Sequence, residues 1–576
     1  MLTYHLSFKN PATQLIEVEI QTVAEVLHPK FHLPMWRPGR YELQRFDKLV
    51  ADVESGNHLK INRLDTHTWQ VLAEKGESIS LKYVFYANQR DSGGSVFDAE
   101  GIYLNYHNFL MYAENQLDTP CKCVLNLPEH YQIACSLKKE GNTFSADTFH
   151  ELIDSPLFAG DKLQYHGFQI DSLKVHLWFM GECQPDFQRF EQDITKYTKT
   201  QVALFGDCPV EEYHYLLQML PTPFRHGVEH QASSVNTFGP GHLLMQPANY
   251  DSFIELLSHE FFHTWNVKYL RPADMYPYDY SEPQYSTLHH VTEGVTSYYG
   301  DLMLLKSGIY TTNRFLQNLN SEIYEFFNML GKDHISLEES SFTSWINGYG
   351  AFTGMPNRKI SFYTKGYLVA FMLDVEIRKN SNNQASMDSV LKHLYQTIAK
   401  KGQGYTKQDY QEAIELFAGV NFDDFFAKYI EGIVPLHNAL KETANYFGWN
   451  YMETSQGATS QRLWGLYLNG STVQDLHEKG ATLAAGLSKG DEIIAIQGQK
   501  VTPQSIEGIF EYFQNKSELS LHYFHFNHLY EAKLTRNENE VCIEVIPFLQ
   551  NTNLFETEKE KAWKSIQTEA YSTSTI

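Results

Sequence analysis

Two histidines separated by three residues could bind one metal ion in this chain. The stretch HEFFHTWN begins at His259, and its second histidine is His263. In an α-helix, residues four positions apart lie about 40° apart around the axis, so both imidazoles project from one face. Glu260 lies about 60° from His263, where its carboxylate could reach a metal-bound water without binding the metal. This combination predicts a zinc site that hydrolyses its substrate with Glu260 as the base.

The same spacing also occurs in buried helices whose histidines are hydrogen-bonded to the backbone and inert. The apolar neighbours Phe261 and Phe262 and a helix start signal favour the metal site. Ser252 followed by Glu255 is typical of a capping box before the apolar run FIELL. We therefore expect the helix to begin near Ser252 and to continue through HEFFHTW.

A catalytic zinc site needs a third protein ligand and one open position. The segment HHVTEGVTSYYGDLMLLKSG (289–308) is typical of a helix, and Glu293 falls in its first turn. His289, His290 and Glu282 are rival ligands. Residue type alone favours Glu293 over these three only slightly.

The elements that must position these side chains change along the chain. Residues 1–165 have the pattern of an antiparallel β domain, as in LIEVEI, where Ile16, Val18 and Ile20 alternate with glutamates. SISLKYVFYA and KCVLNL are further strand candidates, and RPGR and DSGGS are turn signals. The sequence therefore predicts a β-rich N-terminal domain.

Residues 166–445 are expected to form the domain that carries the histidines, with helical periodicity from about residue 190. Residues 455–548 differ again, because GATLAAGLSKGDEIIAIQGQKVT joins a small-residue helix, a Gly-Asp turn and a short apolar strand. The last residues, 549–576, are expected to hold a short helix and then a polar tail. The fold class expected is thus multidomain α+β.

Composition narrows the class of protein. A net charge of −23 argues against nucleic acid or an anionic membrane as the main partner, since either favours a basic surface. The sequence contains no run of about 18 apolar residues, so we expect no transmembrane helix. The first residues have the pattern of a strand rather than of a secretory signal. The six cysteines are sparse and irregularly spaced, which predicts reduced thiols in a cytoplasmic protein.

Beyond the metal motif, several stretches resemble the glycyl aminopeptidase family, zinc peptidases with a C-terminal PDZ domain. HEFFHTWNVKYLRP and TEGVTSYYGDL match around the metal site. LPMWRPGRYELQRF (33–46) resembles the family's Trp-x-Pro-Gly signature, RHGVEHQASS (225–234) its Gly-Gly-x-Glu-His segment, and SFYTKGYLVAFMLDVEIR (361–378) its Tyr-x-Lys-Gly helix. The resemblance implies a β-rich N-terminal domain, a mostly helical thermolysin-like catalytic domain and a PDZ-like domain.

The resemblance also implies roles. His259, His263 and Glu293 match the ligands of one Zn²⁺ per chain, and Glu260 matches the general base. Glu229 matches the glutamate that pairs with the substrate's free α-amine, and Tyr363 matches the tyrosine that donates a hydrogen bond to the oxyanion. The implied reaction is cleavage of the first peptide bond, after a small residue such as Gly or Ala.

Two departures bear on these roles. His226 stands where the family has the first of two glycines, which is tolerable on a substrate-binding edge strand only if its side chain points away. Ser297 replaces a carboxylate common four residues after the ligand glutamate, so Thr296 or Ser297 is expected to orient a ligand by its hydroxyl.

Other interpretations stay open. The chain could be an endopeptidase guided by its PDZ-like domain, or a peptide-binding scaffold without catalysis. The PDZ-like domain could bind a peptide C-terminus or serve only in packing. Two imidazoles and one carboxylate also accept divalent metals other than zinc.

Overall fold

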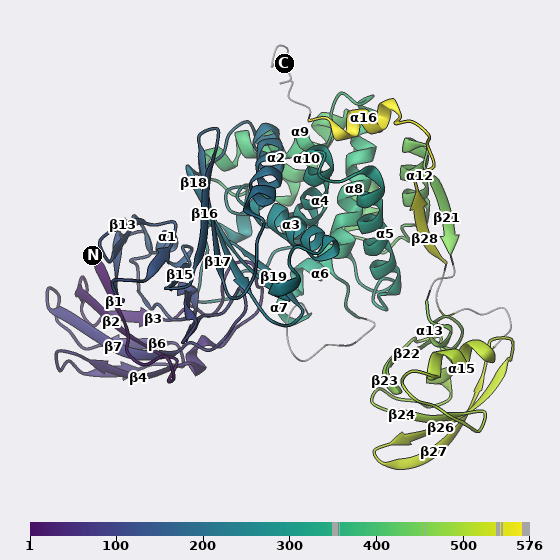
Figure 1. Cartoon of the computed structure of the whole chain (residues 1–576), viewed down its shortest axis with the longest axis horizontal. Helices are drawn as coiled ribbons and strands as arrows, with labels where there is room; N and C mark the ends of the chain where they lie inside the picture. The colour runs from purple at the N-terminus through teal and green to yellow at the C-terminus, as the bar shows by residue number, and fades with distance from the viewer. Residues whose placement is uncertain (348–354, 356–357, 455–456, 537–541, 543–544, 567–576) are drawn as a thin grey trace.

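The computed structural model describes residues 1–347, 355, 358–454, 457–536, 542 and 545–566. A β-rich N-terminal part packs against a central part dominated by helices, and a small β domain extends beyond the helices (Figure 1). Within the described residues, no helix combines the length and the apolar character that crossing a membrane requires.

The N-terminal part is built on a large sheet with alternating burial. In the described chain its seven strands are, in spatial order, β13 (Lys138–Glu140), β14 (Thr143–Ala146), β11 (Cys121–Asn126), β1 (Leu2–Phe8), β2 (Leu15–Val23), β7 (Ser78–Tyr86) and β4 (Val50–Ser55). In β2, Ile16, Val18 and Ile20 are buried between less buried glutamates, which confirms the predicted strand. The expectation of a purely antiparallel domain is wrong, because β1 pairs with β11 in parallel.

Two smaller sheets complete the N-terminal part. One contains β10 (Tyr112–Ala113), β3 (Lys30–His32), β6 (Thr68–Val71) and β5 (Ile61–Arg63). The other contains β12 (Gln132–Ala134), β15 (Leu157–Gly160), β9 (Gly101–Leu104) and β8 (Val96–Asp98). The loop between β3 and β4 holds the WRPGR stretch and runs toward the central part, where the Trp36 indole donates to the Asp279 carbonyl at 2.7 Å.

The central part begins with a mixed sheet that helical periodicity did not predict. Its described strands are, in spatial order, β16 (Gln164–Ile170), β17 (Leu173–Met180), β18 (Glu212–Met219), β20 (Ser233–Gly239) and β19 (Phe224–Glu229). β19 is the edge strand and runs antiparallel to β20. The segment RHGVEHQASS therefore forms a hairpin whose first strand borders the helices.

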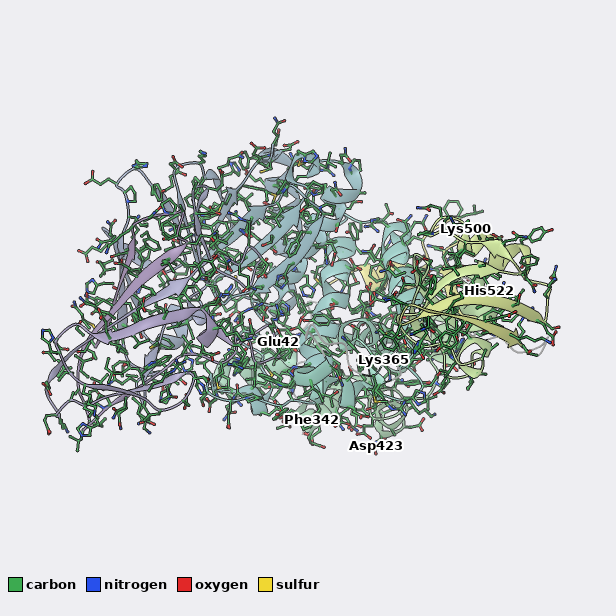
Figure 2. The ribbon with its side chains drawn as sticks, turned by 90° about the horizontal axis from the view of Figure 1, so that it is seen from below. Glu42, Phe342, Lys365, Asp423, Lys500 and His522 are labelled. Atoms are coloured by element: carbon green, nitrogen blue, oxygen red, sulfur yellow. The ribbon has the colours of Figure 1, made fainter. Side chains whose placement is uncertain are left out.

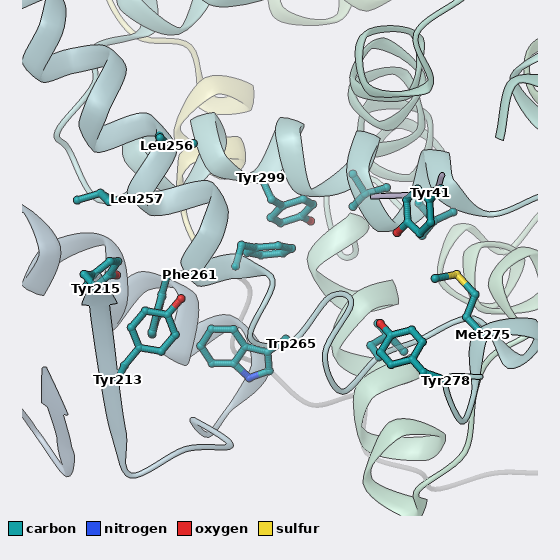
Figure 3. Close-up of a cluster of buried hydrophobic side chains, with 14 of the residues drawn as sticks. Tyr41, Tyr213, Tyr215, Leu256, Leu257, Phe261, Trp265, Met275, Tyr278 and Tyr299 are labelled. Carbon is teal, nitrogen blue, oxygen red and sulfur yellow. The ribbon is translucent and has the colours of Figure 1, made fainter. Parts of the chain in front are cut away.

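The helices are amphipathic or fully buried. The main ones are α2 (Phe187–Phe205), α3 (Pro247–Phe262), α4 (Thr296–Lys306), α5 (Thr312–Asn328), α8 (Phe362–Asn380), α9 (Met387–Thr397), α10 (Lys407–Ala418) and α12 (His437–Phe447). α2 confirms a predicted helix: the Asp186 side chain caps its N-terminus, and Gly206 ends it with φ 96°. Aromatic side chains join α3 to the sheet, since Phe261 packs against Tyr213 and Tyr215 of β18 (Figure 3).

The C-terminal β domain leaves and rejoins the central part through one ribbon. β21 (Asn450–Thr454) pairs antiparallel with β28 (Ile546–Gln550), so the intervening chain is inserted between two paired strands. The Asn320 side chain of α5 binds the backbone of Leu549 with both its amide nitrogen and its oxygen, each at 2.8 Å. This contact fastens the ribbon to the helices.

The inserted domain has its own sheet and its own hydrophobic core. Its described strands are β22 (Leu466–Asn469), β23 (Thr472–Leu476), β24 (Glu492–Ile496), β26 (Glu518–His525) and β27 (His528–Thr535) in spatial order, with β25 (Gln499–Lys500) paired to β24. Helices α13 (Thr459–Trp464), α14 (Ala481–Ala484) and α15 (Ile506–Tyr512) accompany it. In Figure 2, Lys500 and His522 mark this domain at one end of the molecule.

After the ribbon, the chain returns to the helices. A short helix, α16 (Glu558–Lys564), lies in residues 549–576 and confirms the short helix expected there. Its Trp563 has no exposed surface and donates from its indole to the Tyr298 hydroxyl at 3.1 Å. The polar end after residue 566 lies outside the described residues.

Candidate active site

The helix that carries His259 starts earlier than the capping-box pattern predicts. α3 begins at Pro247, with Gln246 as an N-cap that makes no side-chain hydrogen bond. Proline at the first position suits a helix start because its missing N–H would have no partner there. Ser252 and Glu255 lie inside the helix, and Glu255 pairs with Arg225 of β19 instead of capping. The helix also ends earlier than expected, at Phe262, with His263 as its C-cap.

The two histidines nevertheless face each other. Their Nε2 atoms are 3.1 Å apart. On the far side of its ring, His263 Nδ1 lies 2.8 Å from the Asn266 carbonyl oxygen, so a proton on Nδ1 is donated to that carbonyl. This tautomer leaves the Nε2 lone pair free for a metal.

Glu293 completes the group of three. Its Oε2 lies 3.5 Å from His263 Nε2, and the ligand atoms of His259, His263 and Glu293 all lie within 4.8 Å of one another. Tetrahedral ligands about 2.0–2.1 Å from zinc are themselves about 3.3 Å apart, so two of these separations match a zinc site. Two imidazoles and a carboxylate, buried or nearly so, also have the donor chemistry that zinc prefers.

A local break in helix geometry points Glu293 at the histidines. Residues His290–Val295 form a π-helical turn, η5, directly before α4. η5 packs closely on α8: a Cβ on Gly294 would lie 2.5 Å from the Gly366 Cα, so a side chain there would force the two backbones apart. The glycines of TEG and YTKG therefore permit the approach that positions Glu293.

The rival ligands lie elsewhere. His289 stacks on Tyr41, with ring centroids 3.7 Å apart, and His290 Nδ1 lies 3.1 Å from the Thr287 carbonyl oxygen. Burial lowers the pKa of both imidazoles to about 3. Glu282 is exposed. Among the described residues, none of these three joins a metal-capable cluster.

Glu260 sits beside the three ligand residues in a position that requires glycine opposite it. A Cβ on Gly227 of β19 would lie 1.8 Å from Glu260 Oε1. Burial raises the pKa of the Glu260 carboxyl to about 8, and the nearby Glu229 and Glu293 carboxylates contribute to the rise. A bound divalent cation opposes this shift, because positive charge favours the carboxylate.

Glu229 ends β19 at the closed end of the same site. It is 4% exposed, and its Oε1 has no hydrogen-bond partner among the described residues. A Cβ on Gly39 of the WRPGR loop would lie 2.5 Å from Glu229 Oε2. Ligand atoms of Glu229, Glu260 and His263 also lie within 4.8 Å of one another. The N-terminal part thus packs directly against the glutamate implied to bind the substrate amine.

Tyr363 lies in the first turn of α8, after the N-cap Ser361. It is half-buried, and its ring stacks on Phe362 with centroids 4.8 Å apart. It lines the same cavity as the three ligand residues, Glu260 and Glu229; this cavity has a volume of about 470 Å³. All six residues singled out in the sequence therefore meet in one cavity.

That cavity continues past Arg225 toward a polar region on α4 and α5. His226 also lines this cavity. Its position on β19 therefore does not by itself keep the side chain away from a substrate. Its carbonyl oxygen accepts a hydrogen bond from the Ser92 hydroxyl at 2.6 Å. Mainly through burial, the pKa of the His226 imidazole falls to about 4, so this side chain is neutral near pH 7.

Two contributing residues, Tyr41 and Asn266, were not identified from the sequence, whereas Thr296 was. Tyr41 is fully buried, and its hydroxyl donates to Glu293 Oε1 at 3.4 Å. The Thr296 hydroxyl donates to the Thr292 carbonyl at 2.7 Å and accepts a hydrogen bond from the Asn266 side-chain amide at 3.0 Å; the carbonyl of the same Asn266 faces His263 Nδ1. Thr296 thus acts on a ligand indirectly, through Asn266. The WRPGRY stretch could have identified Tyr41 as a candidate, but nothing in the local sequence indicates that the Tyr41 side chain reaches Glu293.

Comparisons with known proteins find matches to two stretches of the sequence and to the fold. Residues 3–161 match the Peptidase M61 N-terminal domain, and residues 252–369 match the M61 glycyl aminopeptidase domain. An aminopeptidase N family protein from Idiomarina loihiensis has the same fold, with a TM-score of 0.88 and 24% identity over 99% of this chain and 100% of that one. No curated protein matches the sequence significantly.

More distant likeness extends to an M1 zinc metallopeptidase from Deinococcus radiodurans, solved in a mutant form with a Tyr-Ser-Ala substrate. Its TM-score is 0.45 at 14% identity, over 73% of this chain and 90% of that one, which is too distant to bear on the site. The domain matches show a chain similar to peptidases. More particularly, residues 3–161 resemble the N-terminal domain of M61 peptidases, and residues 252–369 resemble their glycyl aminopeptidase domain.

Proposed function

We propose that the chain is a zinc aminopeptidase that removes a small N-terminal residue, Gly or Ala, from peptides. The observation that carries this proposal is the position of Glu229. At the end of an edge strand, a buried Glu229 oxygen that has no hydrogen-bond partner in the described part of the chain lies beside the His259, His263 and Glu293 group. Such a carboxylate stabilises an ammonium group and selects for a free chain end.

His259, His263 and Glu293 would hold one zinc ion. When bound, zinc polarises the scissile carbonyl and makes a water molecule more acidic. The structure supports this role through the 3.1 Å and 3.5 Å separations of the ligand atoms and through the Asn266 carbonyl that fixes the His263 tautomer. The role of each ligand is inferred from this geometry together with the domain match.

Glu260 acts as the general base and then as the general acid. It accepts the proton of the attacking water and passes it to the leaving amine. Gly227 leaves room for the Glu260 carboxylate next to β19, so the base lies against the strand along which a substrate backbone would align. Tyr363, at the cavity wall, donates a hydrogen bond from its hydroxyl to the oxyanion, which stabilises the transition state by a few kcal/mol.

The surroundings of Glu229 support the proposed preference for small residues. Gly39 packs against the Glu229 carboxylate, and its φ of 77° suits glycine. A first residue held by Glu229 therefore lies next to backbone rather than next to an open pocket. The cavity also extends past Arg225 to Asn318 and Glu322 of α5, where the rest of a peptide would lie.

The inserted β domain, residues 455–548, is part of the proposal as a PDZ-like module that binds a peptide C-terminus. β22 is an edge strand of the described sheet, which suits strand addition, and the proposed carboxylate-binding segment is the end of α13 and its C-cap Gly465, directly before β22. On sequence grounds we also propose an N-terminal β-rich domain at residues 1–165, a catalytic domain at 166–445, a C-terminal tail at 549–576 and a cytoplasmic location. Neither a PDZ-guided endopeptidase nor a scaffold without catalysis uses Glu229 in this way.

The test is release of glycine from a Gly-initiated peptide, measured beside the same peptide with an acetylated N-terminus. The expected result is chelator-sensitive release from the free peptide alone. Glu260→Ala abolishes release with zinc retained. Glu229→Ala lowers kcat/KM for the free peptide by at least about 100-fold, again with zinc retained.

Cleavage of the acetylated peptide at an equal rate supports the endopeptidase instead. Peptides left intact, with no zinc bound, support the scaffold. Loss of zinc from the Glu229→Ala protein means that Glu229 binds metal rather than substrate.

A further inference from the structure

A second group of ligand-type side chains lies on the central sheet, away from the cavity. His176 on β17 is directly opposite His214 on the parallel strand β18, and Lys174 is opposite Glu212. Since side chains alternate along a strand, Glu212 and His214 project from one face of β18. Tyr213 and Tyr215 project from the other face, toward α3 (Figure 3). The group therefore faces away from the helix that carries His259 and His263.

The three side chains are close enough to share one ion. Their ligand atoms lie within 4.8 Å of one another. His176 Nε2 is 3.5 Å from Glu212 Oε2, and the two imidazole rings stack with centroids 4.4 Å apart. None of the three lines the cavity that contains Glu260.

Outer partners hold two of these side chains in place. The Tyr165 hydroxyl lies 3.0 Å from His176 Nδ1, which leaves Nε2 directed at Glu212. The Lys174 ammonium donates to Glu212 Oε1 at 2.5 Å, which leaves Oε2 toward His176. Histidines and carboxylates that bind metals characteristically use their second polar atom in this way.

The third side chain has an unsatisfied nitrogen. His214 is buried, and its Nδ1 has no hydrogen-bond partner among the described residues; the same is true of His176 Nε2. Buried polar atoms in folded proteins almost always have a partner, so these two nitrogens are suited to bind a ligand.

We propose that His176, Glu212 and His214 bind a second divalent cation of the zinc class. Two neutral imidazoles and a carboxylate suit zinc and its neighbours rather than magnesium or calcium. Glu212 is about half exposed, with 44% of its side-chain surface accessible, so an ion can enter from solvent and keep a water ligand. The ion joins two parallel strands of the central sheet, and its role is structural.

The experiment measures zinc in the full-length protein after chelation, reloading with Zn²⁺ and desalting. We expect two equivalents in the natural protein, one in His214→Gln, one in His263→Gln and none in the double variant. His214→Gln retains peptidase activity. His166→Gln serves as the matched control and should leave two equivalents, because His166 lies on neighbouring β16, where its Nε2 is 2.8 Å from Glu191 Oε2 and its ring stacks on Phe187.

Two further measurements guard against a variant that merely misfolds. Zn²⁺ should raise the thermal unfolding midpoint of His263→Gln, whose remaining site is the one proposed, but not that of the double variant. Glu212→Gln, which keeps the shape of the side chain, should lose the same equivalent as His214→Gln.

The outcomes separate this proposal from that of a catalytic zinc. One equivalent in the natural protein, lost in His263→Gln and kept in His214→Gln, overturns the second site. One equivalent that is lost in His214→Gln and kept in His263→Gln supports the second site and contradicts the catalytic zinc.

Discussion

The Tyr41 hydroxyl of the N-terminal part donates to the Glu293 carboxylate of the central part at 3.4 Å. The same tyrosine ring stacks on His289, so its position is fixed by packing as well as by the hydrogen bond. One residue therefore links the packing of two parts of the chain to the orientation of a proposed metal ligand. The N-terminal part is a structural component of the site rather than an independent appendage.

Tyr41→Phe should weaken zinc binding. The change removes the hydrogen bond to Glu293 and keeps the stacking on His289, so the fold is expected to persist. Loss of such an outer partner typically lowers metal affinity about 10–100-fold. Chelator competition measures the affinity.

The matched control is Tyr83→Phe, another buried tyrosine of the N-terminal part, whose hydroxyl donates to the Phe109 carbonyl at 2.7 Å far from the site. It should leave zinc affinity unchanged. Equal zinc affinity in the Tyr41 variant and the natural protein would show that Glu293 does not depend on this contact.

Gly227→Ala should remove activity while zinc is retained. The added Cβ would lie 1.8 Å from Glu260 Oε1, so either β19 or the proposed base must move. A displacement of about 1 Å in a catalytic group costs about 100-fold in rate. Peptidase assays together with metal analysis separate this effect from loss of the ion.

Gly508→Ala is the control, since nothing lies within 4 Å of a Cβ placed there. Its activity should equal that of the natural protein. A fully active Gly227→Ala protein would mean that β19 is free to shift and does not confine Glu260.

Asp154→Asn should destabilise the packing beneath the amine site. Asp154 Oδ1 lies 2.8 Å from the Lys268 ammonium and 3.1 Å from His230 Nδ1, and both partners are buried. Removing the carboxylate charge leaves Lys268 buried without its counter-charge, which typically costs about 3–5 kcal/mol. Urea unfolding measures the loss.

Glu558→Gln provides the comparison, because it alters an exposed pair with Lys561 on α16. The unfolding midpoint of this variant should not change measurably. An equally small change in Asp154→Asn would show that the Lys268 ion pair adds no net stability.

The Asp154 contribution should also depend on pH. Burial opposes its charge, but Lys268 and then His230 outweigh burial and hold the pKa of this carboxyl well below its usual range. The folded state therefore binds fewer protons than the unfolded state, whose aspartates titrate near pH 3.9. Stability from this group is complete above that pH and falls by about 1.4 kcal/mol per pH unit below it.

Urea unfolding of the natural protein and Asp154→Asn at pH 5 and pH 3 measures this dependence. The difference in stability between the two proteins should shrink at pH 3. A constant difference would assign the acid sensitivity to other carboxyl groups.

Trp563→Ala should destabilise the central part although it alters the last helix described. Trp563 is fully buried, packs against Phe447 and Phe315 with ring centroids 4.9 Å away in each case, and donates to Tyr298. Replacing a buried tryptophan by alanine typically costs about 3–5 kcal/mol. Thermal or urea unfolding measures it.

Phe555→Ala is the nearby control, because Phe555 is 85% exposed. It should have little effect. Similar behaviour of the two variants would place α16 outside the cooperative unit.

Sequence patterns were most informative where one short segment carries all the information. The alternation in β2 and the spacing of His259 and His263 are local, and the structure contains both the strand and the facing imidazoles. Patterns were less informative at element ends. Ser252 suited an N-cap, yet α3 starts at Pro247, because packing of the whole helix outweighs one capping hydrogen bond worth about 1 kcal/mol.

The sequence by itself determined which residue types could bind a metal, the β character of the N-terminal part and the presence of the main helices, since these depend on residue type and on spacing within one segment. Only the tertiary structure decided that Glu293 rather than His289 faces His263, that Gly39 and Tyr41 close the site from another part of the chain, and that Trp563 returns to the core. These contacts join residues as many as 265 positions apart, as between Trp563 and Tyr298. No local periodicity encodes them, because they form only when separately folded surfaces pack together.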